Sequence, residues 1–384
     1  MTFLKERGSA MADKLEQWIQ KVIEPTGIVI NGKNPWDIKV SNNDFYERVR
    51  KDGSLGLGES YMDGWWKCDE LDNFFYKLLS VDIYARIGFL MPVLLSFIRA
   101  RLFNLQTVRR AFQVAEKHYD IGNDLFSAMI GNTMAYSCGY WRSAENLDNA
   151  QEAKLELICK KLNLQAGQTV LDIGCGWGSF ALYALKNYGV KVVGITVSEE
   201  QIKLAEELCW GFPVEFRLQD YRQLSSAEKF DHIVSVGMFE HVGFKNYRIF
   251  FETARKCLKE NGLFLLHTIG SSKTGEDTDP WLNKYIFPNG SLPSLRQIVS
   301  SSEDLFIIED AHNLGTDYDK TLMAWHENFE NSWPKLKNKY GEKFYRMWKY
   351  YLLFCAGIFR ARRAHLWQIV FSLGGVPGGY KSIR

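Results

Sequence analysis

The chain contains 384 residues, of which 46% are hydrophobic and 24% are charged. This globular composition excludes a disordered or fibrous protein, and the length indicates two domains or one large domain with an appendage. Seven cysteines without any Cys-x-x-Cys pair exclude a disulfide framework and a ribbon-type zinc site. We therefore expect a reducing compartment. Aromatic residues make up 14% of the chain, which indicates a need for flat apolar surfaces.

The net charge of +2 is distributed unevenly along the chain. Residues 331–384 contain 11 basic residues, 12 aromatic residues and a single acidic residue, Glu342. Such a segment suits an anionic surface, either phospholipid or nucleic acid, or forms a solvated face that balances the acidic middle of the chain. No RNA-binding signature accompanies it, so we expect no nucleic-acid partner.

The first third of the chain is predicted to be mainly helical. The charged N-terminus lacks the apolar core of a signal peptide, so we do not expect secretion. A short amphipathic helix is predicted at 13–24, and a helix follows Cys68. The longest apolar run, 87–98, has twelve residues, whereas a membrane span takes about 20. Residues 86–115 are typical of an interfacial helix, or of one packed against a neighbouring domain or subunit.

From about residue 150, apolar strands alternate with helices, and short loops separate them. Strands are predicted at 168–174, 191–197, 214–220, 230–237 and 262–270. Helices are predicted at 149–162, 179–188, 198–209 and 246–258. The alternation predicts an α/β fold with a doubly wound parallel sheet. Residues 271–384 form a less regular, aromatic stretch.

The turn after the first of these strands has the sequence VLDIGCGWGS. Gly174, Gly176 and Gly178 allow a tight turn and a close approach of the backbone to a ligand. Glycines alone would be ambiguous with dinucleotide binding. Here Asp172 precedes them, where its carboxylate would repel a pyrophosphate but pair with the amino group of S-adenosylmethionine (SAM). The loop therefore predicts a SAM-dependent, Rossmann-like domain.

The ends of the next two strands supply candidates for binding the rest of the nucleoside. Thr196 and Ser198 follow the second strand, and Gln201 lies one turn further on. These neutral side chains stand where an acid commonly binds the ribose hydroxyls. The third strand ends near Gln219 and Tyr221, which are placed to enclose an adenine ring. We expect all five residues to contact SAM.

Five further strings carry a more specific signal. They are EKHYDIGNDLF at 116–126, MAYSCGYW at 134–141, FEHVG at 239–243, HTIG at 267–270 and LLFCAGIFRARR at 352–363. With the glycine-rich loop, they resemble the cyclopropane synthase family, which holds cyclopropane-fatty-acyl-phospholipid synthases and mycolic acid cyclopropane synthases. The resemblance covers essentially the whole chain, including an N-terminal appendage that the shorter mycolic acid enzymes lack.

The resemblance implies that a methylene group from SAM is added to the cis double bond of an unsaturated phospholipid acyl chain. The methyl group is transferred first, and loss of a proton to bicarbonate from the resulting carbocation closes a cyclopropane ring. It also implies a homodimer without a metal, cytoplasmic and peripherally bound at the inner face of the membrane. We then expect Arg360, Arg362 and Arg363 to hold anionic phospholipid.

Matching the chain to the family's motifs implies a bicarbonate site. The match places the anion among Cys138, Glu240, His267, Ile269 and Tyr318, with backbone N–H groups donated by Cys138 and Ile269. Glu240 is expected to accept the bicarbonate hydroxyl or to orient His267. Taken singly, the glutamate could instead be the acid of a helix N-terminus, and HTIG a buried strand end.

The same match adds Tyr136 and Ser137 to the SAM site. Cys138 and Cys355 are counted with the catalytic group, although a thiolate near a carbocation would be alkylated, so Cys355 is expected at most to line the site.

Aromatic faces stabilise a carbocation without attacking it. We therefore expect the aromatic residues inside the motifs to stabilise the carbocation. They are Tyr119, Tyr136, Tyr140, Trp141 and Phe239. For the remaining aromatic residues we expect ordinary core packing.

We expect a small helical domain at 1–95 for lipid contact or dimerisation, a linker helix at 96–115 and a SAM-dependent catalytic domain at 116–384. Three alternative functions are compatible with the same fold. A small-molecule methyltransferase would need only the loop and one base. A relative that leaves a methyl branch or a hydroxyl differs only in the fate of the cation. A non-enzymatic lipid-binding protein would not need intact catalytic residues.

Overall fold

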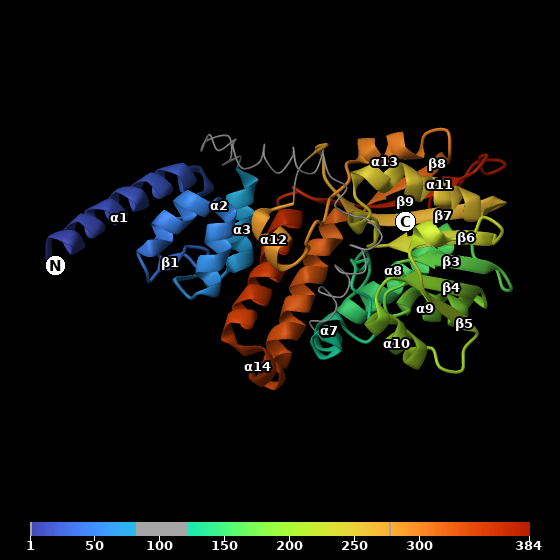
Figure 1. The fold of residues 1–384 in the computed structure, drawn as a ribbon, viewed down its shortest axis with the longest axis horizontal. Helices are drawn as coiled ribbons and strands as arrows, with labels where there is room; N and C mark the ends of the chain where they lie inside the picture. The colour runs from blue at the N-terminus through green and yellow to red at the C-terminus, as the bar shows by residue number, and fades with distance from the viewer. Residues whose placement is uncertain (1, 82–121, 276–277) are drawn as a thin grey trace.

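The computed structural model describes residues 2–81, 122–275 and 278–384. This described part is elongated, with N-terminal helices at one end and a helix-covered sheet at the other (Figure 1). The linker helix expected at 96–115 and the apolar run at 87–98 lie outside the described residues. Within the described ranges, no helix combines the length and hydrophobicity that crossing a membrane requires.

The N-terminal end is a small bundle of helices with one strand pair. Its elements are α1 (Thr2–Ile23), the 3-10 turn η1 (Glu24–Thr26), β1 (Lys39–Val40), α2 (Asp44–Met62), β2 (Trp66–Lys67) and α3 (Leu71–Ser80). The helices predicted at 13–24 and after Cys68 correspond to the second half of α1 and to α3. Phe45, Trp66 and Phe74 are buried together in edge-on and tilted ring contacts. An aromatic core therefore holds this bundle.

The other end contains a seven-stranded sheet in the order β5-β4-β3-β6-β7-β9-β8. Its strands are β3 (Thr169–Ile173), β4 (Lys191–Thr196), β5 (Val214–Leu218), β6 (Phe230–Val236), β7 (Leu258–Gly270), β8 (Ile307–Asn313) and β9 (His365–Ser372). The first five run parallel, whereas β9 is antiparallel to both β7 and β8. The predicted α/β fold is confirmed. The parallel sheet is extended by two strands that the sequence did not indicate, the reversed strand β9 and the edge strand β8, which runs in the direction of the first five.

Helices cover the sheet on both sides (Figure 1). The covering helices are α8 (Leu147–Lys161), α9 (Ser179–Tyr188), α10 (Glu199–Leu208), α11 (Tyr247–Cys257) and α13 (Leu295–Ser302), with 3-10 turns η2 (Tyr221–Gln223), η3 (Phe239–His241) and η4 (Phe244–Asn246). Two further helices lie away from the sheet: α7 (Asn123–Ile130) packs on α14 (Gly315–Arg360), and α12 (Pro280–Tyr285) packs on α2. One apolar core contains Phe250 and Ile298 from α11 and α13, and the other contains Ile158 and Phe180 from α8 and α9. The four predicted helices between 149 and 258 are confirmed to within a few residues.

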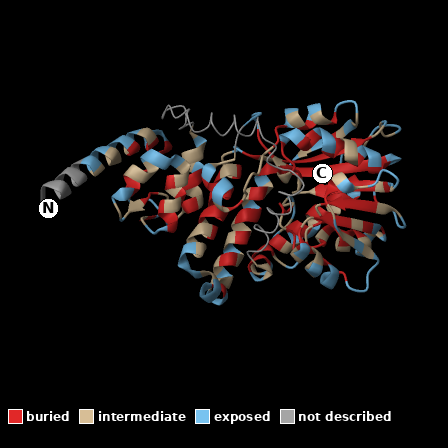
Figure 2. Cartoon of the chain, in the orientation of Figure 1, coloured by how far each residue is buried: buried red, intermediate tan, exposed pale blue. Residues whose placement is uncertain are grey.

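A long helix, α14 (Gly315–Arg360), connects the two ends of the molecule. It bends at Gly341, whose φ of 75° lies in the region that favours glycine. Its two arms therefore run back beside each other, with buried residues concentrated between them and toward the neighbouring helices (Figures 1 and 2). Trp325 and Phe329 on the first arm and Trp348 and Tyr350 on the second are completely buried.

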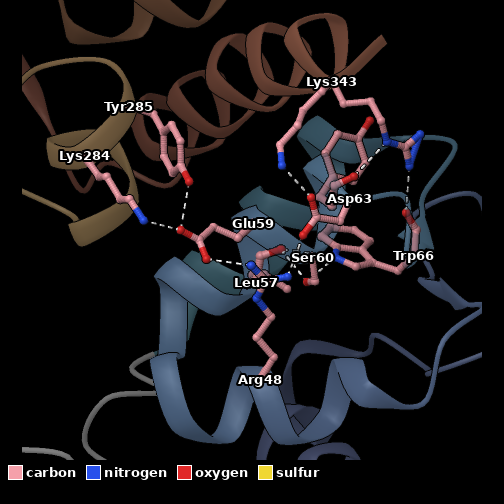
Figure 3. Close-up of polar contacts among 11 residues, drawn as sticks. Arg48, Leu57, Glu59, Ser60, Asp63, Trp66, Lys284, Tyr285 and Lys343 are labelled. Atoms are coloured by element: carbon pink, nitrogen blue, oxygen red, sulfur yellow. Dashed lines mark hydrogen bonds and ion pairs between the residues drawn. The ribbon is translucent and has the colours of Figure 1, made fainter.

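Ion pairs join the N-terminal bundle to α12 and α14 (Figure 3). Lys284 of α12 donates to Glu59 at 2.6 Å, and Lys343 of α14 donates to Asp63 at 2.7 Å. Arg48 bridges the two acids, with 2.7 Å to each. The bundle is thus fastened to both elements through one shared network.

The basic residues near the C-terminus are largely used inside the molecule. Arg360 donates to Asp72 at 2.7 Å and to Asp319 at 2.9 Å, and Arg363 donates to the carbonyl of Leu79 at 2.7 Å. The expectation that Arg360 faces phospholipid is therefore corrected, because its guanidinium group holds α14 to α3. Arg363 is exposed, and its expected contact with phospholipid stays a prediction. Arg362 is exposed and has no such contact among the described residues.

Candidate active site

A cavity of about 190 Å³ lies at the carboxyl ends of β3, β4, β5 and β6. Ligands bind at this edge in open α/β sheets, because loops there diverge to either face. Nine of the eleven residues predicted for SAM line it. They are Tyr136, Ser137, Asp172, Gly174, Gly176, Thr196, Gln201, Gln219 and Tyr221. The structure thus brings together predicted residues from the ends of β3, β4 and β5 and from the segment before α8.

The other two predicted SAM residues support the cavity wall from behind. Gly178 begins α9 with a φ of 82°, and a Cβ there would lie 2.8 Å from the ring of Phe216. Ser198 is the N-cap of α10, where its hydroxyl accepts the N–H of Gln201 at 3.3 Å. Both positions shape the loops that carry the lining residues.

Two of the neutral side chains predicted to bind the ribose hydroxyls lie together at one wall of the cavity. Thr196 Oγ1 donates to Gln201 Oε1 at 2.8 Å, and both side chains are buried. This bond fixes the amide so that its nitrogen, a donor, remains for a ligand hydroxyl. Tyr221 is also buried at this wall and packs edge-on against Phe250.

A buried pair of opposite charges lies at the floor of the cavity. Burial raises the pKa of Asp172 to about 7, and the nearby ammonium of Lys154 opposes this shift. Burial lowers the pKa of Lys154 to about 8. Its Nζ donates to Ser137 Oγ at 2.9 Å. The sequence analysis missed Lys154, although a lysine four residues before Ile158 falls on the apolar face of α8.

A second buried cluster lies around the end of β7. Glu240 Oε1 accepts the Ile269 N–H at 2.6 Å, so this N–H, expected to face an anion, is occupied by the carboxyl group. Glu240 Oε2 is buried without a hydrogen-bond partner in the structure. Tyr318 belongs to the same cluster: burial raises the pKa of its phenol well above the ordinary value, and the nearby Cys138 and Glu240 raise it further.

His267 is held by a residue that the sequence analysis did not select. Gln368 lies directly opposite His267 in the β7–β9 pair, and the distance from Gln368 Nε2 to His267 Nδ1 is 3.2 Å. With the amide donating, the imidazole proton is on Nε2, which is buried without a partner in the structure. Burial also lowers the pKa of His267, which keeps the ring neutral. Gln368 could not be predicted from the sequence, because its place beside His267 depends on the pairing of β9 with β7.

The two candidate cysteines are buried thiols. Cys138 donates to the carbonyl of Gly139 at 3.1 Å and accepts from Thr321 Oγ1 at 3.8 Å. Burial raises the pKa of Cys138 and of Cys355, so both remain protonated. Thr321 Oγ1 also accepts from the Gly139 N–H and from Trp141 Nε1. The motif before α8 is therefore anchored on α14.

Two of the aromatic residues inside the motifs, Tyr136 and Phe239, have different surroundings. Tyr136 lines the cavity, stacks on Trp325 at 5.1 Å between centroids and shares a 2.6 Å hydrogen bond with the hydroxyl of Tyr351. Phe239 instead packs on core residues and is completely buried, which favours core packing over contact with a cation. Tyr119 lies outside the described residues.

Comparison with known proteins identifies the family. The family profile described as mycolic acid cyclopropane synthetase matches residues 106–369. The chain is 55% identical over 379 residues to the cyclopropane-fatty-acyl-phospholipid synthase of Escherichia coli strain K12, covering 99% of this chain and 98% of that protein. The chain belongs to the cyclopropane-fatty-acyl-phospholipid synthase family. The resemblance found in the sequence motifs is thereby confirmed.

Solved structures of cyclopropane synthases share the fold. One from Mycobacterium tuberculosis matches with a TM-score of 0.64 and 30% identity, covering 70% of this chain and 99% of that one. A mycolic acid cyclopropane synthase in complex with SAH and CTAB matches with a TM-score of 0.63 and 32% identity, covering 68% and 97%. The chain is therefore a SAM-dependent methyltransferase of the cyclopropane synthase family, as the glycine-rich loop predicted.

Proposed function

We propose that this cyclopropane synthase acts on the cis double bond of an unsaturated phospholipid acyl chain. Its carbon donor is SAM, held by the nine lining residues named above with support from Gly178 and Ser198. The proposal is supported by the relative that matches over nearly the whole chain, the N-terminal region included, which is named as a phospholipid enzyme. The observation that carries it is a buried acid–base cluster, in addition to the SAM cavity, that simple methyl transfer would not need.

The unpaired atoms of this cluster fit a small anion that also carries a hydroxyl. Among the described residues, Glu240 Oε2 and the Nε2–H of His267 are both buried without hydrogen-bond partners. Leaving such groups unpaired costs about 1–3 kcal/mol each. Bicarbonate offers an acceptor for the imidazole and a hydroxyl or oxygen for the carboxyl group. When bound, it would supply a base too weakly nucleophilic to trap a carbocation.

The protonation of Glu240 suits this role. Burial raises the pKa of Glu240 to about 7, and the Ile269 N–H only partly opposes the shift. A carboxyl group that holds a proton near neutral pH can share it with an adjacent anion, whereas two full negative charges would repel. Ile269 fixes the orientation of this carboxyl, and Tyr318 and the Cys138 backbone close the site.

The buried aromatic and thiol groups around the cluster exclude water. Tyr318 packs on Phe359 at 4.5 Å and edge-on against Trp325. Cys355 is buried on the second arm of α14 and adds an uncharged wall. A dry site protects a carbocation from quenching, so these residues act by enclosure and Cys355 does not act as a nucleophile.

We also infer how the enzyme meets its substrate. Residues 1–95 form a domain for lipid contact or dimerisation, 96–115 link it to the catalytic domain at 116–384, and the homodimer works peripherally at the inner, cytoplasmic face of the membrane. The aromatic content of the chain and its sequence match through the N-terminal region support this assignment.

The test uses the purified full chain with SAM and vesicles of either cis-unsaturated or fully saturated phospholipid. Mass spectrometry should show the gain of one methylene only in unsaturated chains, with loss of the olefin, and faster product formation when bicarbonate is restored to depleted buffer. A methylene gain with the double bond retained would indicate a branching methyltransferase. Unmodified lipid in the presence of bound SAM would refute the proposal.

A further inference from the structure

Lys154 is a buried charge on the wall of the SAM cavity. It lies in α8 with its side chain pointing away from solvent, only 2% exposed, and its Nζ reaches Ser137 Oγ at 2.9 Å. A hydroxyl supplies one of the three acceptors that an ammonium group can use. Burying a charge is costly unless an opposite charge compensates it. Asp172 acts on Lys154 electrostatically but forms no ion pair with it among the described residues, so the ammonium group can still take an anionic partner in direct contact.

The charged residues around the cavity show which partner is missing. The lining contains four of them, which are Lys154, Asp172, Asp220 and Arg222. Asp220 and Arg222 pair with each other at 2.7 Å. Among the described residues, neither Lys154 nor Asp172 has an ion-pair partner within 4.0 Å. The cavity therefore presents one cation and one anion whose charges are left for a ligand.

The methionyl part of SAM carries the complementary pair of charges, an α-carboxylate and an α-ammonium group. We propose that Lys154 binds the α-carboxylate of SAM, while Asp172 takes the α-ammonium group and Ser137 Oγ holds the lysine in place. This inference rests on SAM being the donor and extends the proposed site to a residue of α8. Binding then neutralises two buried charges at once, which gives the site a preference for the intact amino-acid tail.

A second lysine on the same helix provides a matched comparison. Lys161 is also completely buried, seven residues further along α8. Its Nζ lies 3.5 Å from Asp310, which also pairs with Arg384. A neighbouring acid thus explains the burial of Lys161 without any ligand, and its position is absent from the cavity lining.

The test measures the affinity of two probes by calorimetry. One probe is S-adenosylhomocysteine, and the other is its decarboxylated analogue, which keeps the amine and the nucleoside. Removing one partner of a buried charge pair weakens binding by about tenfold or more. The wild-type enzyme should therefore bind the decarboxylated probe at least about tenfold more weakly, and Lys154→Met should lose affinity for S-adenosylhomocysteine by a similar factor.

The decisive quantity is the coupling free energy between two changes, the removal of the carboxylate from the probe and the substitution of Lys154 in the enzyme. Lys154→Met should bind the decarboxylated probe as well as the wild type does, whereas Lys161→Met should preserve the wild-type ratio between the probes. If the wild-type enzyme bound both probes with equal affinity, the proposal would be overturned. This comparison needs no variant, so it remains valid if Lys154→Met fails to fold. Equal weakening of both probes by Lys154→Met would show a structural role and also overturn it. The assay involves no lipid, so its failure is separable from failure of the lipid reaction.

Discussion

Glu240 shows how one side chain can serve both structure and chemistry. One carboxyl oxygen accepts the Ile269 N–H, and the other is buried without a hydrogen-bond partner in the part of the chain that the structure describes. Its sequence motif predicted a functional acid, but the raised pKa depends on burial by elements that are distant in sequence. His267 shows the same limit, since its tautomer is set by Gln368 from a strand that the sequence did not predict.

We expect Glu240→Gln to lower turnover on the order of a hundredfold, because the amide retains the bond to Ile269 but cannot exchange a proton. The affinity for S-adenosylhomocysteine should stay within about twofold, since Glu240 is absent from the cavity lining. Steady-state kinetics and calorimetry measure the two effects separately. Glu260→Gln, on an exposed residue of β7, is the control. Wild-type turnover in Glu240→Gln would remove this acid from the mechanism.

Glu240 also predicts a pH dependence of stability. Its pKa rises from 4.5 to about 7 in the folded protein, so the folded state binds the proton more tightly. Its stabilising contribution is therefore complete below pH 4.5 and is lost as the pH rises through 7, with a total of about 3 kcal/mol. Denaturant unfolding should show Glu240→Gln gaining stability relative to the wild type between pH 4.5 and 8. If the difference in unfolding free energy between Glu240→Gln and the wild type did not change with pH, Glu240 would ionise with the same pKa in the folded and unfolded states.

At the scale of elements, the sequence predicts best where one face of an element is buried. The parallel strands and their covering helices were recognised because apolar runs alternate with amphipathic periods. The long helix α14 was missed because it buries residues against α2, α3 and α7 as well as between its own arms, which obscures a single apolar face. β9 was missed because its short apolar run lies beyond any recognisable strand–helix alternation.

The contact between α2 and α12 gives a prediction at this scale. Gly58 faces Trp281, and a Cβ at that position would come within 2.3 Å of the indole Cδ1. Gly58→Ala should therefore reduce the free energy of unfolding by about 1–3 kcal/mol, despite the better helix propensity of alanine. Chemical denaturation checks this against Gly374→Ala, where a Cβ meets no atom within 4 Å. Equal stability of the two variants would contradict the packing described here.

At the scale of the whole molecule, the basic C-terminal segment holds the N-terminal bundle to the catalytic part. Among the described residues, four basic residues of this segment contact the bundle, which are Lys343, Arg346, Arg360 and Arg363. Lys339, Lys349 and Arg384 instead pair with acids outside the bundle, which are Asp124, Glu330 and Asp310. Composition alone could not distinguish this use from a lipid-binding face, because the acidic partners are far away in the sequence. The contacts instead show that these side chains hold the two parts of the molecule together.

We expect Arg360→Gln to lower the free energy of unfolding by about 2 kcal/mol, somewhat less than a fully buried ion pair, because its guanidinium is 25% exposed. Arg362→Gln should change stability by less than about 0.5 kcal/mol. Urea unfolding measures both. If Arg360→Gln weakened binding to anionic vesicles and left stability unchanged, the arginine would face lipid and the internal role would be wrong.

The central claim, that the SAM methyl group becomes a ring carbon, is tested most directly with SAM carrying a trideuterated methyl group. The purified enzyme is incubated with unsaturated phospholipid vesicles, and the acyl chains are analysed by mass spectrometry and NMR. Ring closure requires the loss of one proton from the transferred methyl, so we predict a cyclopropane that retains two deuterium atoms. Retention of all three in a methyl branch, or absence of label from the lipid, would contradict the account.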